Sequence, residues 1–283
     1  MRGILITILV VAFFAPPLAA QELTGTLQQI QKTGKIKIGY RHSQPPMSFL
    51  DKDDKPAGYS IDLCTHIVNE IKNRIGSEID IEYVPVKAQD RFVAVAENRI
   101  DILCGSTTKT LSRSEVVDFT QLTFVTGASF MTLNGKEIRN NFEGKKIGVV
   151  KGTTTAVALK NLFQKTSIDA EIILLNTTTE GLSALGKEKI DAFSADQVVL
   201  IGLVLATDDP AKFSILPEVF SYEPFALAVR RNDADFRLIA DRVISRLYRT
   251  REILKIYDKW FGRFAAKRTS AFAALIQLNA TPE

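Results

Sequence analysis

The 283-residue sequence predicts an α/β protein with two lobes, each built on a mainly parallel sheet that helices cover. Two observations lead to this fold class. Short strand-like segments alternate with helical segments, and this alternation requires crossover connections between parallel strands. The alternation starts again at Lys145, which divides the chain into two similar halves. The length agrees, because a domain usually contains roughly 100 to 200 residues.

The amino terminus has the layout of a secretory signal. Arg2 is followed by an apolar run from Gly3 to Phe14 and by small residues that end at Ala20. The run is too short to cross a bilayer comfortably, and its flanks are those of a cleaved segment. We therefore predict a signal peptide at residues 1–20, a periplasmic location for the rest of the chain, and no lipid anchor.

The first lobe is expected to begin with a helix, a strand and a second helix. Apolar residues at helical spacing precede Gly34, and residues 35–40 alternate as strand residues do. Ser60 is the expected cap of the second helix, and its apolar face ends near Gly76. The remaining elements predicted for this half are a strand at 78–84, a helix at 89–99 and a strand at 100–105.

The second lobe repeats this order. Its predicted strands are 145–150, 170–175 and 190–193, and its predicted helices are 156–163, 179–187 and 196–204. The last third of the chain adds a strand at 225–231 and helices at 234–248 and 252–261. These last elements can complete either lobe. From Ala265 onward the pattern is weaker and does not indicate where the tail packs.

Charge and motif spacing exclude several classes of function. The chain has 36 Lys and Arg residues against 32 Asp and Glu residues, and its net charge of +4 is too small for a nucleic-acid-binding surface. The two histidines, His42 and His66, belong to no cluster with metal-ligand spacing, so no metal site is expected. No turn has the glycine spacing of a dinucleotide loop or the ending of a P-loop, and no cofactor is expected.

The two cysteines, Cys64 and Cys104, leave two possibilities open. After export both lie in an oxidising compartment, where a disulfide between them can persist. Each can equally be a small buried apolar residue, because Cys64 lies on the apolar face of a helix and Cys104 at the end of a strand.

Two turns are the first candidates for ligand binding. The sequences CGSTT (104–108) and KGTTT (151–155) each follow a predicted strand. In open α/β sheets, ligands bind beyond the carboxyl ends of the strands. Each turn offers hydroxyl groups and free backbone N–H groups, and two such turns facing one another can bind a carboxylate. The alternative for each turn is ordinary helix capping.

Two charged residues lie near these turns. Arg113 follows the first turn at a distance from which its guanidinium can return to bind a carboxylate in bidentate fashion, whereas the alternative is a surface arginine. Asp196 follows an apolar strand at the start of a helix. Its carboxylate can bind an ammonium group or simply cap the helix.

The order of these motifs resembles the polar amino-acid-binding proteins of ABC importers, solute-binding protein family 3. The resemblance covers nearly the whole mature chain, and it is greatest to glutamate/aspartate-binding members, which carry a comparable CGSTT turn. The segments that carry it are YRHSQPPMSF (40–49), GYSIDL (58–63), CGSTTKTLSRSEVVDFT (104–120), KGTTT (151–155), IDAFSADQ (190–197) and IYDKWFG (256–262).

The resemblance implies the type II periplasmic-binding-protein-like fold, in which two hinge crossovers join two lobes and the ligand cleft lies between them. Lobe one is expected to comprise 21–125 plus 224–283, and lobe two 126–223. The crossovers are expected near Phe124–Ala128 and Tyr222–Ala226. Closure of the lobes on the ligand by a hinge motion follows from this arrangement.

The resemblance also assigns roles to residues. Arg113 is expected to bind the α-carboxylate of an amino acid and Asp196 its α-ammonium. Arg41 and Arg91 are expected to contact an acidic side chain, and the alternative for both is a solvated surface position. Ser106, Thr108 and Thr154 are expected to contribute N–H or hydroxyl donors to the α-carboxylate. Thr107 and Thr153 are also expected to bind the ligand.

Two departures from the family's pattern leave the exact ligand open. Ala88 stands where glutamate/aspartate binders often have a serine, and Thr178 stands where some have a histidine. Glutamate and aspartate differ by one methylene, which is worth only about 1–3 kcal/mol in a fitted pocket. A neutral or polar amino acid such as glutamine remains an alternative ligand.

The expected partners are a small-molecule amino acid and the membrane permease of an ABC importer, with no nucleic acid, and the protein is expected to be a monomer. We expect a binding protein and not an enzyme. A periplasmic dehydratase-like enzyme on the same fold is the alternative, but it requires an acid or base poised in the cleft.

Overall fold

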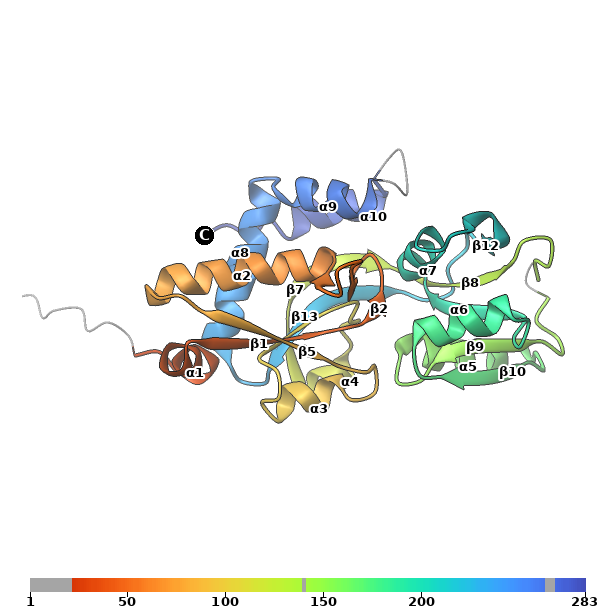
Figure 1. Ribbon diagram of the computed structural model, residues 1–283, viewed down its shortest axis with the longest axis horizontal. Helices are drawn as coiled ribbons and strands as arrows, with labels where there is room; N and C mark the ends of the chain where they lie inside the picture. Colours follow the sequence, from red (N-terminus) through yellow and green to blue (C-terminus); the bar gives the residue numbers. More distant parts are fainter. Residues whose placement is uncertain (1–21, 139–140, 263–267) are drawn as a thin grey trace, which may run out of the picture.

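The computed structural model describes residues 22–138, 141–262 and 268–283 and folds into two lobes that lie side by side (Figure 1). The predicted signal peptide, residues 1–20, lies outside the described residues. Each lobe is built on one five-stranded sheet, and helices cover both faces. None of the described helices is long and apolar enough to cross a membrane.

The sheet of the first lobe has the strand order β5-β1-β6-β13-β7. Strand β1 (Lys35–Tyr40) pairs in parallel with β5 (Asp80–Pro85) and β6 (Ile102–Cys104). Strand β13 (Glu223–Arg230) runs antiparallel to β6 and to β7 (Val117–Thr126). A small sheet stands beside it, formed by β2 (Ser43–Gln44), β3 (Ser48–Leu50) and β4 (Pro56–Ala57).

Helices lie on both faces of the first sheet (Figure 1). The short helices α3 (Arg91–Ala96) and α4 (Leu111–Ser114) pack on one face, over a cluster that includes Leu103 and Phe119. The other helices of this lobe are α1 (Gly25–Thr33), α2 (Tyr59–Ile75), α8 (Ala234–Arg249), α9 (Ile253–Phe261) and α10 (Ser270–Leu278).

The sheet of the second lobe has the order β10-β9-β11-β8-β12. Strand β9 (Lys146–Val150) is parallel to β10 (Glu171–Leu175) and β11 (Ala192–Asp196). Strand β8 (Ala128–Leu133) is antiparallel to β11 and to β12 (Phe213–Ile215). The helices of this lobe are α5 (Thr154–Thr166), α6 (Thr178–Gly186), α7 (Gln197–Leu205) and the 3-10 turn η1 (Pro210–Lys212).

The prediction of mainly parallel sheets was wrong for half of the strand pairings. In each sheet, two pairings are parallel and two are antiparallel. The reversed strands are β13 in the first sheet and β8 in the second, and each is the first strand after a passage between the lobes. A chain that crosses from the other lobe enters the sheet in the opposite direction, and the periodicity of a single strand does not reveal this direction.

The chain passes from the first sheet to the second between Thr126 and Ala128 and returns between Ile215 and Glu223. The two passages lie against one another, because the N–H of Ala128 donates to Ser221 Oγ at 3.0 Å. A Cβ on Gly127 would lie 2.5 Å from the carbonyl oxygen of Ser221, so the close approach requires glycine.

Helix α2 begins earlier than predicted. Its first residue is Tyr59, and Gly58 occupies the capping position in place of the predicted Ser60. The hydroxyl of Ser60 lies in the first turn and donates to the carbonyl of Gly105 at 3.1 Å, which ties the helix to the turn after β6. The predicted end at Gly76 is confirmed, since this glycine closes the helix in the left-handed conformation.

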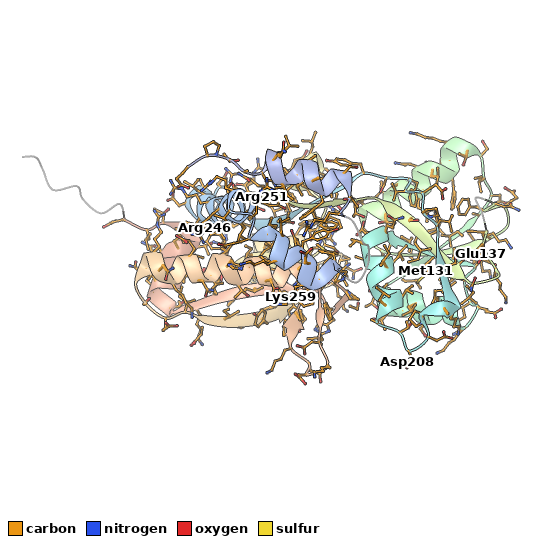
Figure 2. The ribbon with its side chains drawn as sticks, turned by 90° about the horizontal axis from the view of Figure 1, so that it is seen from above. Met131, Glu137, Asp208, Arg246, Arg251 and Lys259 are labelled. Atoms are coloured by element: carbon orange, nitrogen blue, oxygen red, sulfur yellow. A yellow bond between two sulfur atoms is a disulfide. The ribbon has the colours of Figure 1, made fainter. Side chains whose placement is uncertain are left out.

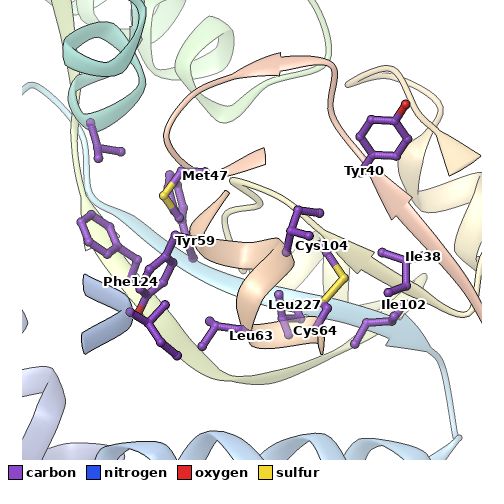
Figure 3. Close-up of a cluster of buried hydrophobic side chains, with 14 of the residues drawn as sticks. Ile38, Tyr40, Met47, Tyr59, Leu63, Cys64, Ile102, Cys104, Phe124 and Leu227 are labelled. Atoms are coloured by element: carbon purple, nitrogen blue, oxygen red, sulfur yellow. A yellow bond between two sulfur atoms is a disulfide. The ribbon is translucent and has the colours of Figure 1, made fainter. Parts of the chain in front are cut away.

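The core of the first lobe lies between α2 and the sheet (Figure 3). Tyr59, Phe124 and Leu227 meet there, and Tyr59 donates to the carbonyl of Thr123 at 2.9 Å. Of the two possibilities for the cysteines, the structure has the disulfide, which joins Cys64 of α2 to Cys104 of β6.

The tail of the chain packs on the first lobe. Phe272 of α10 stacks on Tyr257 of α9 with ring centroids 4.1 Å apart, and the Asn279 side chain donates to the carbonyl of Leu122 in β7. Surface ion pairs also join α2 to the helices after β13. For example, Lys259, which is labelled in Figure 2, lies 2.7 Å from Asp62. Such exposed pairs contribute little to stability, so apolar packing holds this layer.

Candidate ligand-binding site

The two lobes are in contact along the edge where the predicted binding turns lie. The hydroxyl of Thr178, the first residue of α6, lies 3.0 Å from the hydroxyl of Ser43 in β2. Helix α7 approaches the same segment so closely that a Cβ on Gly202 would collide with the carbonyl of Pro45. Residues of both lobes therefore meet along this edge.

The turn after β6 is buried, and two of its three hydroxyl groups have partners in the first lobe or the crossover. Ser106 donates to Gln44 Oε1 at 2.7 Å, and Thr108 donates to Glu223 Oε2 at 2.5 Å. Thr107 is fully buried, and its hydroxyl has no hydrogen-bond partner among the described residues. Donors of this turn thus line the boundary between the lobes.

The turn after β9 leads into α5, and its threonines have different roles. Thr153 caps the helix: its hydroxyl donates to the carbonyl of Val150 at 2.7 Å and accepts from the N–H of Ala156 at 3.2 Å. Thr154 is the first helical residue, and its hydroxyl donates to Glu223 Oε2 at 2.6 Å. The first N–H groups of a helix have no acceptor within it, so this end of α5 offers donors to an anion.

Arg113 and Arg91 both lie over one aromatic ring. The guanidinium carbons of Arg91 and Arg113 are 4.5 and 5.0 Å from the centroid of Phe92. Arg113 donates to the carbonyl of Thr108 at 2.7 Å, which brings it back to the first turn as its position in the sequence predicted. Arg91 donates to the carbonyl of Ala88 and, at 3.4 Å across the lobe boundary, to that of Gly152.

Arg41 and Arg91 are both buried, with 6% and 2% of their surface exposed. The alternative of solvated surface positions is therefore wrong for both side chains. Burial lowers the pKa of Arg41 to about 10, and the nearby Asp196 carboxylate opposes this shift. Burial also lowers the pKa of Arg91, and the positive charges of Arg113 and Arg41 lower it further.

Asp196 is the last residue of β11 and occupies the capping position of α7, but its side chain forms no cap hydrogen bond. Its Oδ1 is buried and has no hydrogen-bond partner among the described residues. Burial, followed by the negative charge of Glu223, raises the pKa of this carboxyl to about 8, although three arginines oppose the shift. The capping alternative is therefore wrong, and the carboxyl remains open to another partner.

The cleft thus gathers three arginines from the first lobe and Asp196 from the second. The guanidinium groups are close enough to perturb one another and the Asp196 carboxyl electrostatically. None of them is ion-paired to a carboxylate among the described residues. Buried charges are normally paired, so the arrangement favours a ligand that carries both anionic groups and a cationic group.

Sequence reasoning missed Glu223, Gln44 and Phe92, which contact the predicted residues. Glu223 is 1% exposed, and besides the two threonines its carboxylate accepts from Ser221 Oγ at 2.7 Å. The sequence did offer one signal for Glu223, because a charged residue stands there at the start of an apolar strand, within the predicted second crossover. In the described ranges, no group of three or more His, Cys, Asp or Glu side chains could hold a metal ion.

Comparison with known proteins identifies the family to which the chain belongs. Residues 36–263 match the bacterial extracellular solute-binding proteins, family 3. The chain is 32% identical over 263 residues to the L-glutamate/L-aspartate-binding protein of Pseudomonas aeruginosa, covering 92% of this chain and 87% of that protein. It is 29% identical over 246 residues to the glutamate/aspartate import solute-binding protein of Escherichia coli K12, covering 86% and 82%.

A solved structure carries the same fold. The crystal structure of the cysteine-binding protein from Campylobacter jejuni matches with a TM-score of 0.74 at 24% identity, covering 87% of this chain and 97% of that one. The predicted type II fold with two lobes is thereby confirmed. At this identity the likeness concerns the fold alone.

Proposed function

The chain belongs to the bacterial extracellular solute-binding proteins, family 3, as its motifs predicted. On this premise we propose that it captures glutamate or aspartate between its lobes and delivers the amino acid to the membrane permease of an ABC importer. The proposal places the protein in the periplasm as a monomer, after removal of residues 1–20. The names of its relatives in Pseudomonas aeruginosa and Escherichia coli support an acidic amino acid.

The observation that carries the proposal is a set of three arginines, of which Arg41 and Arg91 are buried and Arg113 is half-buried, opposite an aspartate with an unpaired carboxylate oxygen. An acidic amino acid has two carboxylates and one ammonium group, which are complementary in sign to the three guanidinium groups and the one carboxyl group of this set. Arg113 binds the α-carboxylate, and Asp196 binds the α-ammonium. Arg41 and Arg91 bind the side-chain carboxylate.

The donors around the α-carboxylate come from both lobes. Thr108 and Thr154 direct their hydroxyls to Glu223, so their backbone N–H groups are the donors assigned to the ligand. The hydroxyl of Thr153 is engaged in its cap, and this residue therefore acts through the end of α5. The remaining donors proposed for the site are Ser106 and Thr107.

The proposed capture of the ligand depends on the distribution of the binding groups between the two lobes. We assign lobe one to 21–125 plus 224–283 and lobe two to 126–223. A ligand held by the arginines of lobe one draws Asp196 and the end of α5 toward it, and closure about the crossovers creates the surface that the permease recognises.

A neutral amino acid such as glutamine is the competing ligand. A hydrogen bond to a charged group contributes about 1.5–3 kcal/mol, and an uncharged side chain beside Arg41 and Arg91 forgoes this gain for at least one of them. Glutamate and glutamine have nearly the same shape, so their relative affinity measures the effect of the side-chain charge alone.

A dehydratase-like enzyme is the second candidate function, and one observation favours it. Asp196 has a carboxyl pKa of about 8, as a general acid in the cleft would. Turnover of a bound amino acid during prolonged incubation would support this candidate. Recovery of the ligand unchanged would leave binding as the function.

The test is a comparison of ligands with protein from which any bound amino acid has been removed by unfolding and refolding. A ligand that binds only the native state raises stability, by about 2.7 kcal/mol at 100 times its Kd. We expect the melting temperature to rise selectively with glutamate or aspartate. A larger rise with glutamine would overturn the acidic specificity, and no rise with any amino acid would overturn the binding function.

A further inference from the structure

Glu223 lies where the second crossover enters the first sheet. It is the first residue of β13 and pairs in register with Thr126, the last residue of β7. Its carboxylate is buried and accepts from Thr108 at 2.5 Å, from Thr154 at 2.6 Å and from Ser221 at 2.7 Å. These three donors come from the first lobe, the second lobe and the crossover itself.

The two threonines belong to the turns that face one another across the lobe boundary. Their hydroxyl oxygens are 3.2 Å apart, and both approach the same oxygen, Oε2 of Glu223. A threonine hydroxyl has one hydrogen to donate, and here that hydrogen is directed to Glu223. The side chain of Glu223 therefore fixes both the spacing of the turns and the orientation of their hydroxyls.

We propose that Glu223 is a positioning residue for ligand capture, which joins Thr108 of the first lobe to Thr154 of the second so that the backbone N–H groups of both turns meet one carboxylate. The part concerning the ligand rests on the proposed function, whereas the part concerning the lobe contact does not. Glu223 also acts electrostatically on the groups assigned to the ligand's backbone. Burial lowers the pKa of Arg113 and the charge of Glu223 opposes this shift, whereas burial raises the pKa of Asp196 and the charge of Glu223 raises it further.

The test uses the full mature chain and three variants. E223A removes all three acceptor contacts, whereas E223Q keeps an oxygen that can accept from both threonines. E218A is the matched control, because Glu218 is an exposed carboxylate in the same crossover segment. Circular dichroism melting identifies any variant that does not fold, and E223Q keeps the test open if E223A fails.

Small-angle X-ray scattering without added ligand measures the contact between the lobes. We expect E223A to have a larger radius of gyration than wild type, because the acceptor that joins the lobes is gone, and E223Q and E218A to stay near wild type. An unchanged radius in folded E223A would overturn the proposal. This readout is independent of the ligand, so it still decides the role of Glu223 if no amino acid binds.

Calorimetric titration with glutamate and aspartate measures the effect on capture. We expect E223A to bind about 10- to 100-fold more weakly than wild type, the range for losing hydrogen bonds to a charged group, and E223Q to recover most of the loss. T108V in the E223A background should weaken binding much less than T108V alone, because the two residues act through one contact. Additive losses, or equal affinities of E223A and E218A, would contradict the proposal.

Discussion

The two lobes contribute different titratable groups to the proposed cleft, guanidinium groups from the first and a carboxyl group from the second. The first lobe supplies Arg41, Arg91 and Arg113, and the second supplies Asp196 and the amino-terminal end of α5. The arginines come from three separate segments around one sheet, whereas Asp196 ends a single strand. The groups of each lobe therefore lack partners within that lobe, and the proposed ligand, a zwitterion with an extra carboxylate, would provide partners for both.

A second group of charged residues in the first lobe differs from the proposed site, because its carboxylates are paired with other groups of the protein. Asp101 is buried but accepts from the N–H of Lys37 at 2.8 Å and lies 3.6 Å from Arg230. Asp233 accepts from the N–H of Thr26 at 2.9 Å. These carboxylates obtain their partners from the protein, whereas Oδ1 of Asp196 finds none among the described residues. A buried carboxylate oxygen without a partner among the described residues thus distinguishes the proposed binding cleft from a structural network.

The largest effect is expected from Arg113→Met, which removes the cation assigned to the α-carboxylate. Every amino acid has this carboxylate, so binding of glutamate, aspartate and glutamine should weaken by a similar amount, about 2–5 kcal/mol for loss of one partner of a buried charge pair. Isothermal titration calorimetry measures the change. Arg74→Met is the control, because Arg74 is exposed on α2. A loss confined to the acidic ligands would contradict the assignment.

Asp196→Asn tests the contribution of the second lobe. The substitution keeps the shape of the side chain and removes the anion assigned to the α-ammonium, so affinity should fall by about 1.5–3 kcal/mol for acidic and neutral amino acids alike. Asp208→Asn is the matched control, since Asp208 is an exposed carboxylate of the same lobe (Figure 2). Wild-type affinity in Asp196→Asn would show that the ligand does not bridge the lobes in this way.

Arg41→Met sharpens the comparison within the first lobe. Arg113 is assigned to a group that all amino acids share, whereas Arg41 is assigned to the side chain. We expect glutamate to lose about 1.5–3 kcal/mol and glutamine to change little, so that the ratio of their affinities moves toward one. Competition titrations of the two ligands measure this ratio. Equal losses for both ligands would place Arg41 outside the side-chain pocket.

Most elements of the fold could be predicted because each follows a local rule. The alternation of residues 35–40 defined β1, and glycines at positions 34 and 76 marked two helix ends. Strands β7, β8 and β12 were missed because they are recognisable mainly by their antiparallel pairing with distant partners. Ser60 misled the prediction of the α2 start, since Gly58 permits a backbone conformation that a side chain rarely adopts.

The site could be predicted in part, and the residues that were missed are those whose roles depend on contacts between positions far apart in the sequence. Strand ends and the order of motifs indicated the arginines, the two turns and Asp196. Glu223 was missed because its role depends on contacts with Thr108 and Thr154, which lie 115 and 69 residues away in the chain. Phe92 was missed for a related reason, because its contacts with the guanidinium groups of Arg91 and Arg113 depend on the fold and are not visible in the sequence.

The smallest and most graded prediction concerns pH. Burial and the charge of Glu223 raise the carboxyl pKa of Asp196 to about 8 against the opposing charges of three arginines, so at pH 7 this carboxyl is mainly protonated. An α-ammonium favours the ionised form and lowers this pKa, so binding releases a proton. Affinity should therefore rise with pH up to about 8, by at most about tenfold, or 1.4 kcal/mol, for each pH unit below that value.

The pH dependence of the affinity distinguishes the contributions of the two lobes in one experiment. Titrations between pH 6 and pH 8 in buffers of different ionisation enthalpy measure the protons released together with the affinity. The slope should survive in Arg41→Met, which acts on the side chain from the first lobe, and disappear in Asp196→Asn, whose amide does not titrate. E223Q should shift the rise to lower pH, because Glu223 is one of the charges that raise the pKa of Asp196. A slope that persists in Asp196→Asn would assign the proton to another group and remove Asp196 as the partner of the ammonium.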